Sequence, residues 1–539
     1  MRCMRSVAWG GKGDMPSEPT IGEFLYGILP RLRTDTAFPW WPPDVFALCL
    51  TLLRHTGAYT QLFQDWPPDR GSDEALAYWT SSVRLLGRQW RAALHEKRPF
   101  RDLIVMPNEW QLLCESFPQQ LWRVGRNHRL LQALMKLIAV ADEASEGVGA
   151  PEDTGEDDFF LRSTRAFLMT DTTLGVEIDP TRVRVLPRMH TPQTGLTERS
   201  LSLHLSLCDA GEVTTGWLST PFRQRDSINL LLIPWPHEVL VKQFREVADS
   251  ATRLPGKSGF FTYDFLEGDE DPIALVESLY REANRRLGGI DGVILPELAI
   301  TDQQFRVLRD KLPQECFLLA GVGHSAIGAQ RGVNEVRLSF PTLDEVVQRK
   351  HHPWKLNEAQ VIQYSLGGRL SPSRDWWEYA DFTDRHLSFI SISEDLVMCA
   401  LICEDLARPD PVAEIVRTVG PNLVIALLMD GPQTKERWAA RYASVLADDP
   451  GCSVLSLTSV GMAELSRPAA GPSRSRVVAL WKDALKGATE IELPARCDAV
   501  AVSLSIRYRE EFTADGRGDD VAFPILSGVH PITATRTGK

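Results

Sequence analysis

The sequence predicts an α/β protein in which a helical N-terminal domain precedes a larger domain of buried strands and amphipathic helices. Apolar residues recur at helical spacing throughout residues 20–141. From residue 227 onward, short and fully apolar runs alternate with amphipathic stretches, as in a layered α/β fold with buried sheets. Between these regions, residues 142–158 hold eight acidic residues and no basic one.

These patterns divide the chain of 539 residues, which is too long for one ordinary domain. The acidic stretch reads as a solvated linker because it contains almost nothing that could build a core. We expect a disordered N-terminus at 1–19, a helical N-terminal domain at 20–141, an acidic linker at 142–158, a β-rich lead-in segment at 159–226, the α/β domain at 227–510 and a C-terminal tail at 511–539.

Composition excludes several classes of partner and cofactor. The formal net charge of −12 gives no overall attraction to nucleic acid. The sequence contains no run of about 18 apolar residues, so it predicts no membrane-spanning helix. The nine cysteines are scattered without a Cys-x-x-Cys pair, which favours a reducing, cytoplasmic setting over a disulfide framework or zinc site. We therefore expect no metal, no cofactor and no membrane or nucleic-acid partner.

Three reactive side chains lie at the ends of predicted strands or between them. Glu297 follows an apolar strand at 293–295, Cys403 follows one at 400–402, and Lys350 lies between the two. The ends of buried strands are where an open α/β sheet presents its active site. In such a group the carboxylate takes the thiol proton, the thiolate attacks a carbonyl or nitrile carbon, and the ammonium stabilises the negative charge that develops.

Each of these residues alone is more often structural than catalytic. A glutamate after a strand usually starts a helix, a cysteine at a strand end usually fills the core, and a lone lysine is usually solvated. A papain-like pair would need His386 or His324 beside Cys403, and nothing in their sequence setting favours it. The adjacent His351 and His352 do not have the spacing of a metal site. Only the order and context of the three residues together favour catalysis.

Their motifs resemble those of the nitrilase, or carbon–nitrogen hydrolase, superfamily. Residues 295–297 read Leu-Pro-Glu and residues 402–405 read Ile-Cys-Glu-Asp. Lys350 is followed eight residues later by Glu358, as in the aliphatic-amidase form of the family. The resemblance covers residues 227–510, about half of the chain.

The resemblance implies a four-layer α-β-β-α sandwich that often dimerises through its helical face, and an acyl-enzyme reaction on a small amide-like substrate. Glu297 would be the general base and Cys403 the nucleophile. Lys350 and the backbone N–H after Cys403 would hold the oxyanion, and Glu358 would orient the leaving amine or the lysine. Register favours Lys350 over Lys355, because only Lys350 has the glutamate at the eighth position.

The residues expected around the substrate depart from the family pattern. The loop after the next strand reads Met-Asp-Gly-Pro at 429–432, and the family's Arg-Ala-x-Glu-Asn signature survives only in part at 441–443. The sequence therefore predicts a carbon–nitrogen hydrolase without naming its substrate. The alternative is a catalytically idle nitrilase-fold module for assembly or binding, with the helical N-terminal domain contacting a protein partner.

A second resemblance concerns the flanking segments. Residues 184–205 and the Thr-Ala-Asp-Gly-Arg run at 513–517 are similar to nitrilase-like regions fused to some bacterial reverse transcriptases linked to phage defence. The chain contains no Tyr-x-Asp-Asp motif of a reverse transcriptase. What this resemblance implies is a role in antiphage defence.

Overall fold

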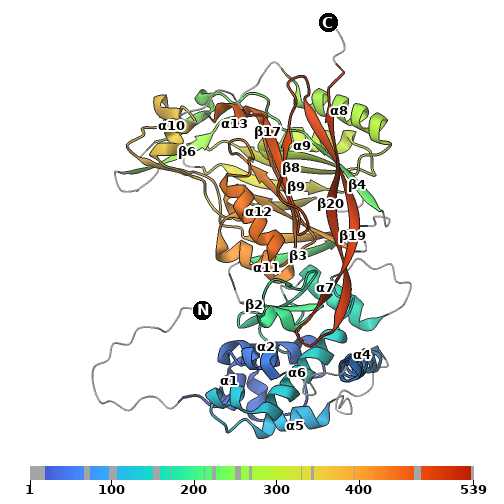
Figure 1. The fold of residues 1–539 in the computed structure, drawn as a ribbon. Coiled ribbons are helices and arrows are strands. Elements are labelled where there is room, and N and C mark those ends of the chain that lie inside the picture. Colours follow the sequence, from blue (N-terminus) through green and yellow to red (C-terminus); the bar gives the residue numbers. More distant parts are fainter. Residues whose placement is uncertain are drawn as a thin grey trace. The chain divides into compact units, whose positions relative to one another are not determined.

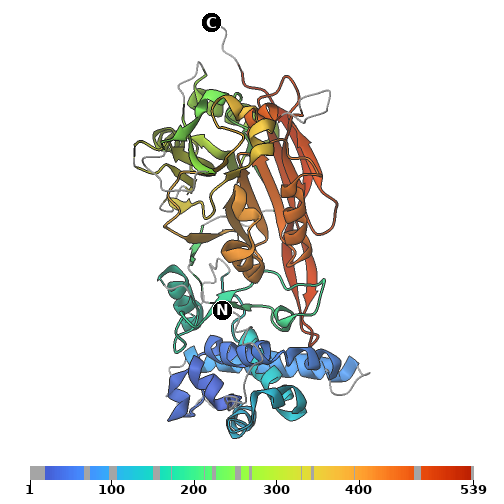
Figure 2. The same cartoon turned by 90° about the vertical axis from the view of Figure 1, so that its left-hand side faces the viewer.

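The chain folds into two compact units in a computed structural model (Figures 1 and 2). Unit 1 comprises Met1–Gly211 and Glu510–Asp520, and unit 2 comprises Glu212–Arg509 and Val521–Lys539. The described residues are 18–65, 73–95, 106–149, 158–170, 173–209, 211, 213–220, 226–248, 257–265, 270–328, 330–340, 345–393, 395–466 and 475–535.

Unit 1 is mainly helical. Its helices are α1 (Ile21–Ile28), α2 (Pro42–Thr56), α3 (Tyr59–Asp65), α4 (Asp73–His95), α5 (Pro107–Glu115), α6 (His128–Glu143) and α7 (Phe159–Thr170), followed by the antiparallel pair β1 (Val183–Pro187) and β2 (Leu205–Asp209). Helix α1 starts at a capping box in which Thr20 and Glu23 satisfy each other's backbone N–H groups. Helix α6 is the centre of the unit and contacts α2, α4 and α5.

The acidic stretch differs from the linker that its composition suggested. Asp142 and Glu143 end helix α6 with buried side chains, and residues 150–157 lie outside the described residues. The two units divide after Gly211 instead. The lead-in segment expected to be β-rich begins with helix α7. Of the N-terminus expected to be disordered, 1–19, residues 1–17 also lie outside the described residues.

The segment expected to be a C-terminal tail is largely a strand. Strands β19 (Ala499–Phe512) and β20 (Gly518–Ile532) are neighbours in one sheet, and residues 510–520, the tip between them, belong to unit 1. A sequence-only division placed the boundary at 510/511 because nothing local marks a hairpin that returns to the first half of the chain.

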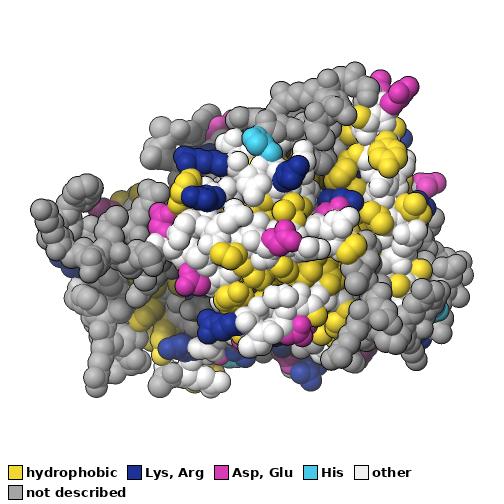
Figure 3. Space-filling model, turned by 90° about the horizontal axis from the view of Figure 1, so that it is seen from below, with side chains coloured by type: hydrophobic (Ala, Val, Ile, Leu, Met, Phe, Trp, Pro, Cys, Tyr) yellow, Lys and Arg dark blue, Asp and Glu magenta, His cyan; other side chains and the backbone are white. Residues whose placement is uncertain are grey.

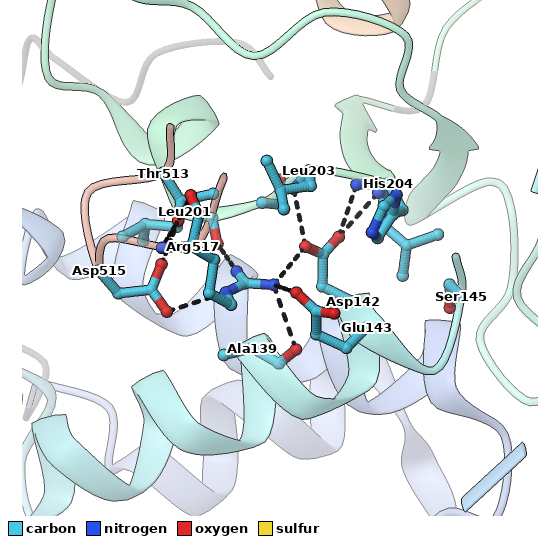
Figure 4. A network of polar contacts seen from close by, with 12 residues as sticks. Ala139, Asp142, Glu143, Ser145, Leu201, Leu203, His204, Thr513, Asp515 and Arg517 are labelled. Atoms are coloured by element: carbon cyan, nitrogen blue, oxygen red, sulfur yellow. Dashed lines mark hydrogen bonds and ion pairs between the residues drawn. The ribbon is translucent and has the colours of Figure 1, made fainter. Parts of the chain in front are cut away.

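Arg517 at this tip is the centre of a buried polar network within unit 1 (Figure 4). Its guanidinium is paired at 2.9 Å with each of three buried carboxylates, those of Asp142, Glu143 and Asp515. Asp142 in turn accepts the backbone N–H groups of residues 203–205 at 2.7–3.0 Å. Burial alone would raise the pKa of Asp142, but the Arg517 charge outweighs it and lowers that pKa below its usual value.

Unit 2 contains two seven-stranded sheets and a smaller one among its described residues. The first sheet has the order β10 (Val346–Arg349), β9 (Val333–Ser339), β8 (Phe317–His324), β7 (Gly292–Ile300), β4 (Ser227–Leu232), β19 and β20. The second has the order β18 (Thr489–Glu492), β17 (Val477–Lys482), β16 (Ser453–Thr458), β15 (Leu423–Leu428), β14 (Leu396–Ile402), β13 (His386–Ser393) and β3 (Thr214–Ser219). The small sheet has the order β11 (Lys355–Leu356), β12 (Asp375–Glu378), β6 (Ser258–Tyr263) and β5 (Phe244–Val247).

The two large sheets contact each other, since β7 meets β15 and β16, and β9 meets β14. Helices α8 (Pro272–Leu287) and α9 (Asp302–Lys311) pack on the first sheet, in one core with β7 and β8. Helix α12 (Trp438–Asp448) packs on β16 and β17, and α11 (Glu414–Val419) and α13 (Val460–Leu465) also connect strands of the second sheet. The expectation of an α/β fold is confirmed.

Within the described parts of the chain, no helix is long and apolar enough to cross a membrane. Figure 3 shows hydrophobic side chains among scattered charges on the face that is seen from below. The exposed large apolar residues of unit 1 include Tyr78, Leu85 and Trp122.

Candidate active site

Glu297 is presented by an irregularity in strand β7. The pairing of β7 with β8 shifts register between Leu295 and Ile300, and Leu298 has a positive φ of 50°. Gly321 on β8 makes this possible, because a Cβ there would lie 2.3 Å from the Pro296 carbonyl oxygen. The bulge therefore re-aims the glutamate while β7 itself stays buried throughout.

Lys350 lies between two carboxylates. It follows β10 directly, and its Nζ donates to Glu297 Oε1 and to Glu378 Oε2, both at 2.7 Å. The Lys350 side chain is 1% exposed. Glu378, at the end of β12, is further fixed by the Trp354 backbone N–H at 3.0 Å. Lys350 is thus held by ionic hydrogen bonds on two sides, which orient its ammonium group.

Asn334 joins the same two carboxylates from strand β9. Its Nδ2 donates to Glu297 Oε1 at 2.8 Å and to Glu378 Oε1 at 2.7 Å, which fixes the orientation of the amide. Its buried Oδ1 finds no hydrogen-bond partner within the described chain. One acceptor is therefore left free beside the carboxylates.

Burial sets the electrostatics of this group. Burial, aided by the charge of Glu378, raises the pKa of Glu297 above its usual value although Lys350 opposes the shift. Burial alone would lower the pKa of Lys350, but the two carboxylates outweigh it and hold that pKa well above normal. The lysine is therefore a permanent cation, and Glu297 is a carboxylate with a strengthened affinity for a proton.

Cys403 follows strand β14 at the start of a 3₁₀ turn, η8 (Cys403–Leu406). Its φ of 46° lies in the left-handed region, which costs about 1–3 kcal/mol for a residue with a side chain. Burial and the negative charge of Glu297 raise the pKa of its thiol well above normal, while Lys350 opposes the shift. The resting sulfur is therefore a protonated thiol that needs a base.

Asp405 clamps the lysine segment to the cysteine turn. Its buried carboxylate accepts the backbone N–H groups of His351 and His352 at 3.0–3.1 Å, and contacts their Nδ1 atoms at 3.2 and 2.9 Å. Burial alone would raise the pKa of Asp405, but the histidine hydrogen bonds lower it below its usual value. Because Lys350 precedes His351 and Cys403 lies two residues before Asp405, the clamp fixes their separation.

We expect Asp405→Asn to destabilise the protein by about 1–3 kcal/mol at pH 7. The NH₂ group of the new asparagine is a donor and would face backbone N–H groups that also need an acceptor. A carboxylate with a depressed pKa stabilises the folded state above the unfolded pKa of about 4, and this contribution is lost as pH falls through the folded pKa. The difference in free energy of unfolding between the wild type and Asp405→Asn, measured with urea, should therefore become smaller below about pH 4. A difference that is constant from pH 3 to pH 7 would show that the Asp405 charge contributes nothing.

The loop after β15 is fixed by a second buried acid. Asp430 accepts hydrogen bonds from Tyr364 Oη, from Arg437 Nη2 at 2.6 Å and from Trp438 Nε1 at 2.8 Å. The preceding residue, Met429, donates its backbone N–H to Glu297 Oε2 at 2.6 Å. This loop departs from the family pattern in sequence, and here it holds one oxygen of the candidate base.

A small pocket opens beside the two carboxylates. Its lining includes Glu297 and Glu378 together with the apolar or aromatic side chains of Phe261, Tyr263, Leu298, Val333, Trp354 and Met429. The free cavity is about 20 Å³, enough for roughly one water molecule. The exposed His324 also lines it.

The structure brings Glu297, Lys350 and Cys403 together but leaves Glu358 outside. Glu358 is an exposed residue in the first turn of α10 (Glu358–Gln363), so the position beside the lysine belongs to Glu378. The spacing of eight residues in sequence was misleading because the chain turns away after the short strand β11. Lys355 pairs with Asp375 with its side chain 38% exposed.

Sequence reasoning missed Glu378, Asn334 and the Asp405 clamp. The one available signal for Glu378 was its place at the end of a short aromatic strand, and Asn334 gave none. Among the described residues, no three His, Cys, Asp or Glu side chains come together in a way that could hold a metal ion.

Comparisons with known proteins give likeness of structure only. No protein-family model and no curated protein matches the chain. Solved structures that align with it include Nit3 of Saccharomyces cerevisiae, from branch 10 of the nitrilase superfamily, at 12% identity over 52% of this chain and 90% of that one, with a TM-score of 0.32. The CN-hydrolase superfamily protein XC1258 of Xanthomonas campestris aligns at 14% identity over 52% of this chain and 91% of that one, with a TM-score of 0.31. The C. elegans NitFhit protein aligns at 13% identity over 53% of this chain and 61% of that one, with a TM-score of 0.32. The structural neighbours named here are thus nitrilase-superfamily members, at identities and TM-scores too low to assign a function.

Proposed function

We propose that unit 2 is a cysteine-dependent hydrolase of non-peptide carbon–nitrogen bonds, amides or related groups, and that it works through an acyl-enzyme. The observation that carries this proposal is the buried group of Glu297, Lys350 and Glu378 beside the thiol of Cys403. Burying two carboxylates and an ammonium is costly, and a fold that needs only stability does better with apolar residues.

In the first half of the reaction Glu297 takes the thiol proton of Cys403. Its raised pKa favours this transfer. The thiolate attacks the substrate carbonyl carbon, the carbonyl electrons move to oxygen, and Lys350 with the backbone N–H after Cys403 stabilises the oxyanion. The tetrahedral intermediate then collapses, and the leaving amine departs with the proton that Glu297 returns.

In the second half water attacks the thioester. Glu297 now accepts a proton from water, the acid product leaves, and the thiol is restored. Glu378 keeps Lys350 charged and oriented, the role first assigned to Glu358.

Alkylation by iodoacetamide, itself a small amide, tests the nucleophile and its base together. We expect Cys403 to be alkylated in the native protein and Glu297→Gln to slow this alkylation at least roughly 10²-fold, since the buried thiol would lose its base. Peptide mass spectrometry over time measures each cysteine separately.

Other cysteines serve as internal controls. The half-buried Cys114 and Cys497 should react at the same rate in both proteins, and Cys399, buried four residues earlier on β14, should stay unmodified. Alkylation of Cys403 at the same rate in Glu297→Gln would contradict the assignment of Glu297 as base.

The competing proposal is an idle nitrilase-fold module that serves assembly. It predicts that Cys403 is inert to iodoacetamide, so the same experiment decides between the two. A four-layer sandwich that dimerises through its helices, and a role in antiphage defence, are further parts of the proposal that rest on family resemblance.

A further inference from the structure

Three hydrogen-bond donors among the described residues hold Glu297 and leave it one open acceptor position. Its Oε1 accepts from Lys350 Nζ at 2.7 Å and from Asn334 Nδ2 at 2.8 Å. Its Oε2 accepts the Met429 backbone N–H at 2.6 Å. Each carboxylate oxygen has two lone pairs. Two donors therefore occupy Oε1, and the position that remains for a further proton is on Oε2.

Asn334 is tied to Lys350 by its backbone as well as by its side chain. Its backbone carbonyl oxygen accepts the Lys350 backbone N–H at 3.0 Å. Its Nδ2 donates to Glu378 Oε1 at 2.7 Å in addition to Glu297. One residue of β9 thus fixes the start of the lysine side chain and both carboxylates that the lysine ammonium reaches.

The orientation of the Asn334 amide leaves its own acceptor without a partner. With Nδ2 turned toward the two carboxylates, the buried Oδ1 has no hydrogen-bond partner among the described residues. A buried acceptor without a partner destabilises a fold, and native structures contain few of them. What explains the amide at this position is therefore the donation of its N–H groups to the carboxylates.

We propose that Asn334 is a positioning residue that occupies Oε1 of Glu297 and so keeps Oε2 open for the thiol proton of Cys403. This inference rests on the proposed function and adds a residue to it. Burial, aided by the charge of Glu378, raises the pKa of Glu297, and the Asn334 hydrogen bond opposes that rise because it stabilises the charged form. A base must be ionised to accept a proton, so Asn334 extends the pH range in which Glu297 works.

The pH dependence of Cys403 alkylation by iodoacetamide tests this role. The sulfur forms a bond to the CH₂ group, iodide leaves, and the thiol proton passes to Glu297. The rate should fall in acid as Glu297 becomes protonated. The titratable groups that act on this carboxyl among the described residues are Lys350, Glu378 and Cys403. The midpoint of the fall therefore reports the ionisation of Glu297 in this setting.

Asn334→Leu removes the N–H donor at similar side-chain volume. The midpoint of the fall should move to higher pH by about one pH unit, since a hydrogen bond to the charged carboxylate is lost. Asn334→Ala leaves room for a water molecule as a substitute donor, so its midpoint should move in the same direction by less. Peptide mass spectrometry gives the rate at each pH, and circular dichroism shows that the variants are folded.

Two controls separate this role from packing and from Glu378. Val336→Ala truncates a buried side chain two residues along, on the same face of β9, and should leave the midpoint unchanged. In the Glu378→Gln background, Glu297 is the carboxylate that still faces the Asn334 amide. The shift caused by Asn334→Leu should therefore persist in that background.

The results distinguish this inference from the proposed function. If Cys403 alkylation depends on Glu297 but both Asn334 variants keep the wild-type midpoint, the role of Asn334 is wrong and the hydrolase stands. An equal shift in Val336→Ala, or no shift in the Glu378→Gln background, would also overturn that role. Absence of Cys403 alkylation at every pH would remove the proposed function and this inference with it.

Discussion

Replacing Lys350 by methionine should abolish turnover, with a loss of roughly 10²-fold or more if its ammonium stabilises the oxyanion. The same change should destabilise unit 2 by about 3–5 kcal/mol, because it leaves the carboxylates of Glu297 and Glu378 buried together without their cation. One of them must then bind a proton, so the loss of stability should shrink as the pH is lowered. Single-turnover hydrolysis and urea unfolding measure the two effects.

Two further variants separate catalysis from folding. Lys355→Met removes a half-exposed ammonium that pairs with Asp375, so it should change the rate of turnover and the free energy of unfolding only a little. In the double variant Lys350→Met, Glu378→Gln the buried charges are reduced together, so much of the stability should return while turnover stays absent. Recovery of turnover in the double variant, or a dead Lys355→Met, would exclude the role given to Lys350.

Replacing Arg517 by methionine should have the largest effect on unit 1, a loss of about 3–5 kcal/mol. The variant would leave the buried carboxylates of Asp142, Glu143 and Asp515 without their shared cation. Asp142 has a depressed pKa in the folded state, so its contribution is complete above the unfolded pKa of about 4 and is lost as pH falls through the folded pKa. The difference in free energy of unfolding between Arg517→Met and the wild type should therefore be largest at pH 7 and small in acid.

Arg84→Met provides the matched control for this second prediction. Arg84 approaches the same Glu143 at 3.5 Å, but its side chain is 42% exposed. Its loss should cost less than about 1 kcal/mol. Thermal unfolding of the full chain at pH 7 compares the stabilities of the two variants. Equal losses of stability would mean that the burial of Arg517 does not strengthen its ion pairs.

Local pattern was sufficient to predict the residues of the candidate site that directly follow apolar runs, although Glu297 lies within β7 at its irregularity and not after its end. Glu297 and Cys403 follow apolar runs whose length and composition are typical of buried strands, and Lys350 closes a strand in the same way. These positions depend on short-range properties of the chain. The same is true of the alternation that predicted an α/β fold.

Long-range pairing decided the parts that sequence could not provide. Glu378 reaches the lysine segment because β12 pairs antiparallel with β11, where Trp377 lies opposite Lys355 and the Glu378 backbone N–H donates to the Trp354 carbonyl oxygen at 2.9 Å. No local pattern announces that partner, so a spacing rule selected Glu358 instead. In the same way Asp142 and Glu143 looked like solvated linker residues because Arg517 lies 375 and 374 positions later in the chain.

The hairpin of β19 and β20 has a consequence for the order in which the protein can be made. Unit 1 is incomplete without residues 510–520, although the rest of it lies within the first 211 residues. When the ribosome has released those first residues, Asp142 and Glu143 still lack the Arg517 guanidinium that pairs with both of them. The first unit to be synthesised therefore completes its fold only after most of the second has emerged. Until then, the surfaces of unit 1 that residues 510–520 cover stay exposed, and exposed surface in an incompletely folded chain favours aggregation.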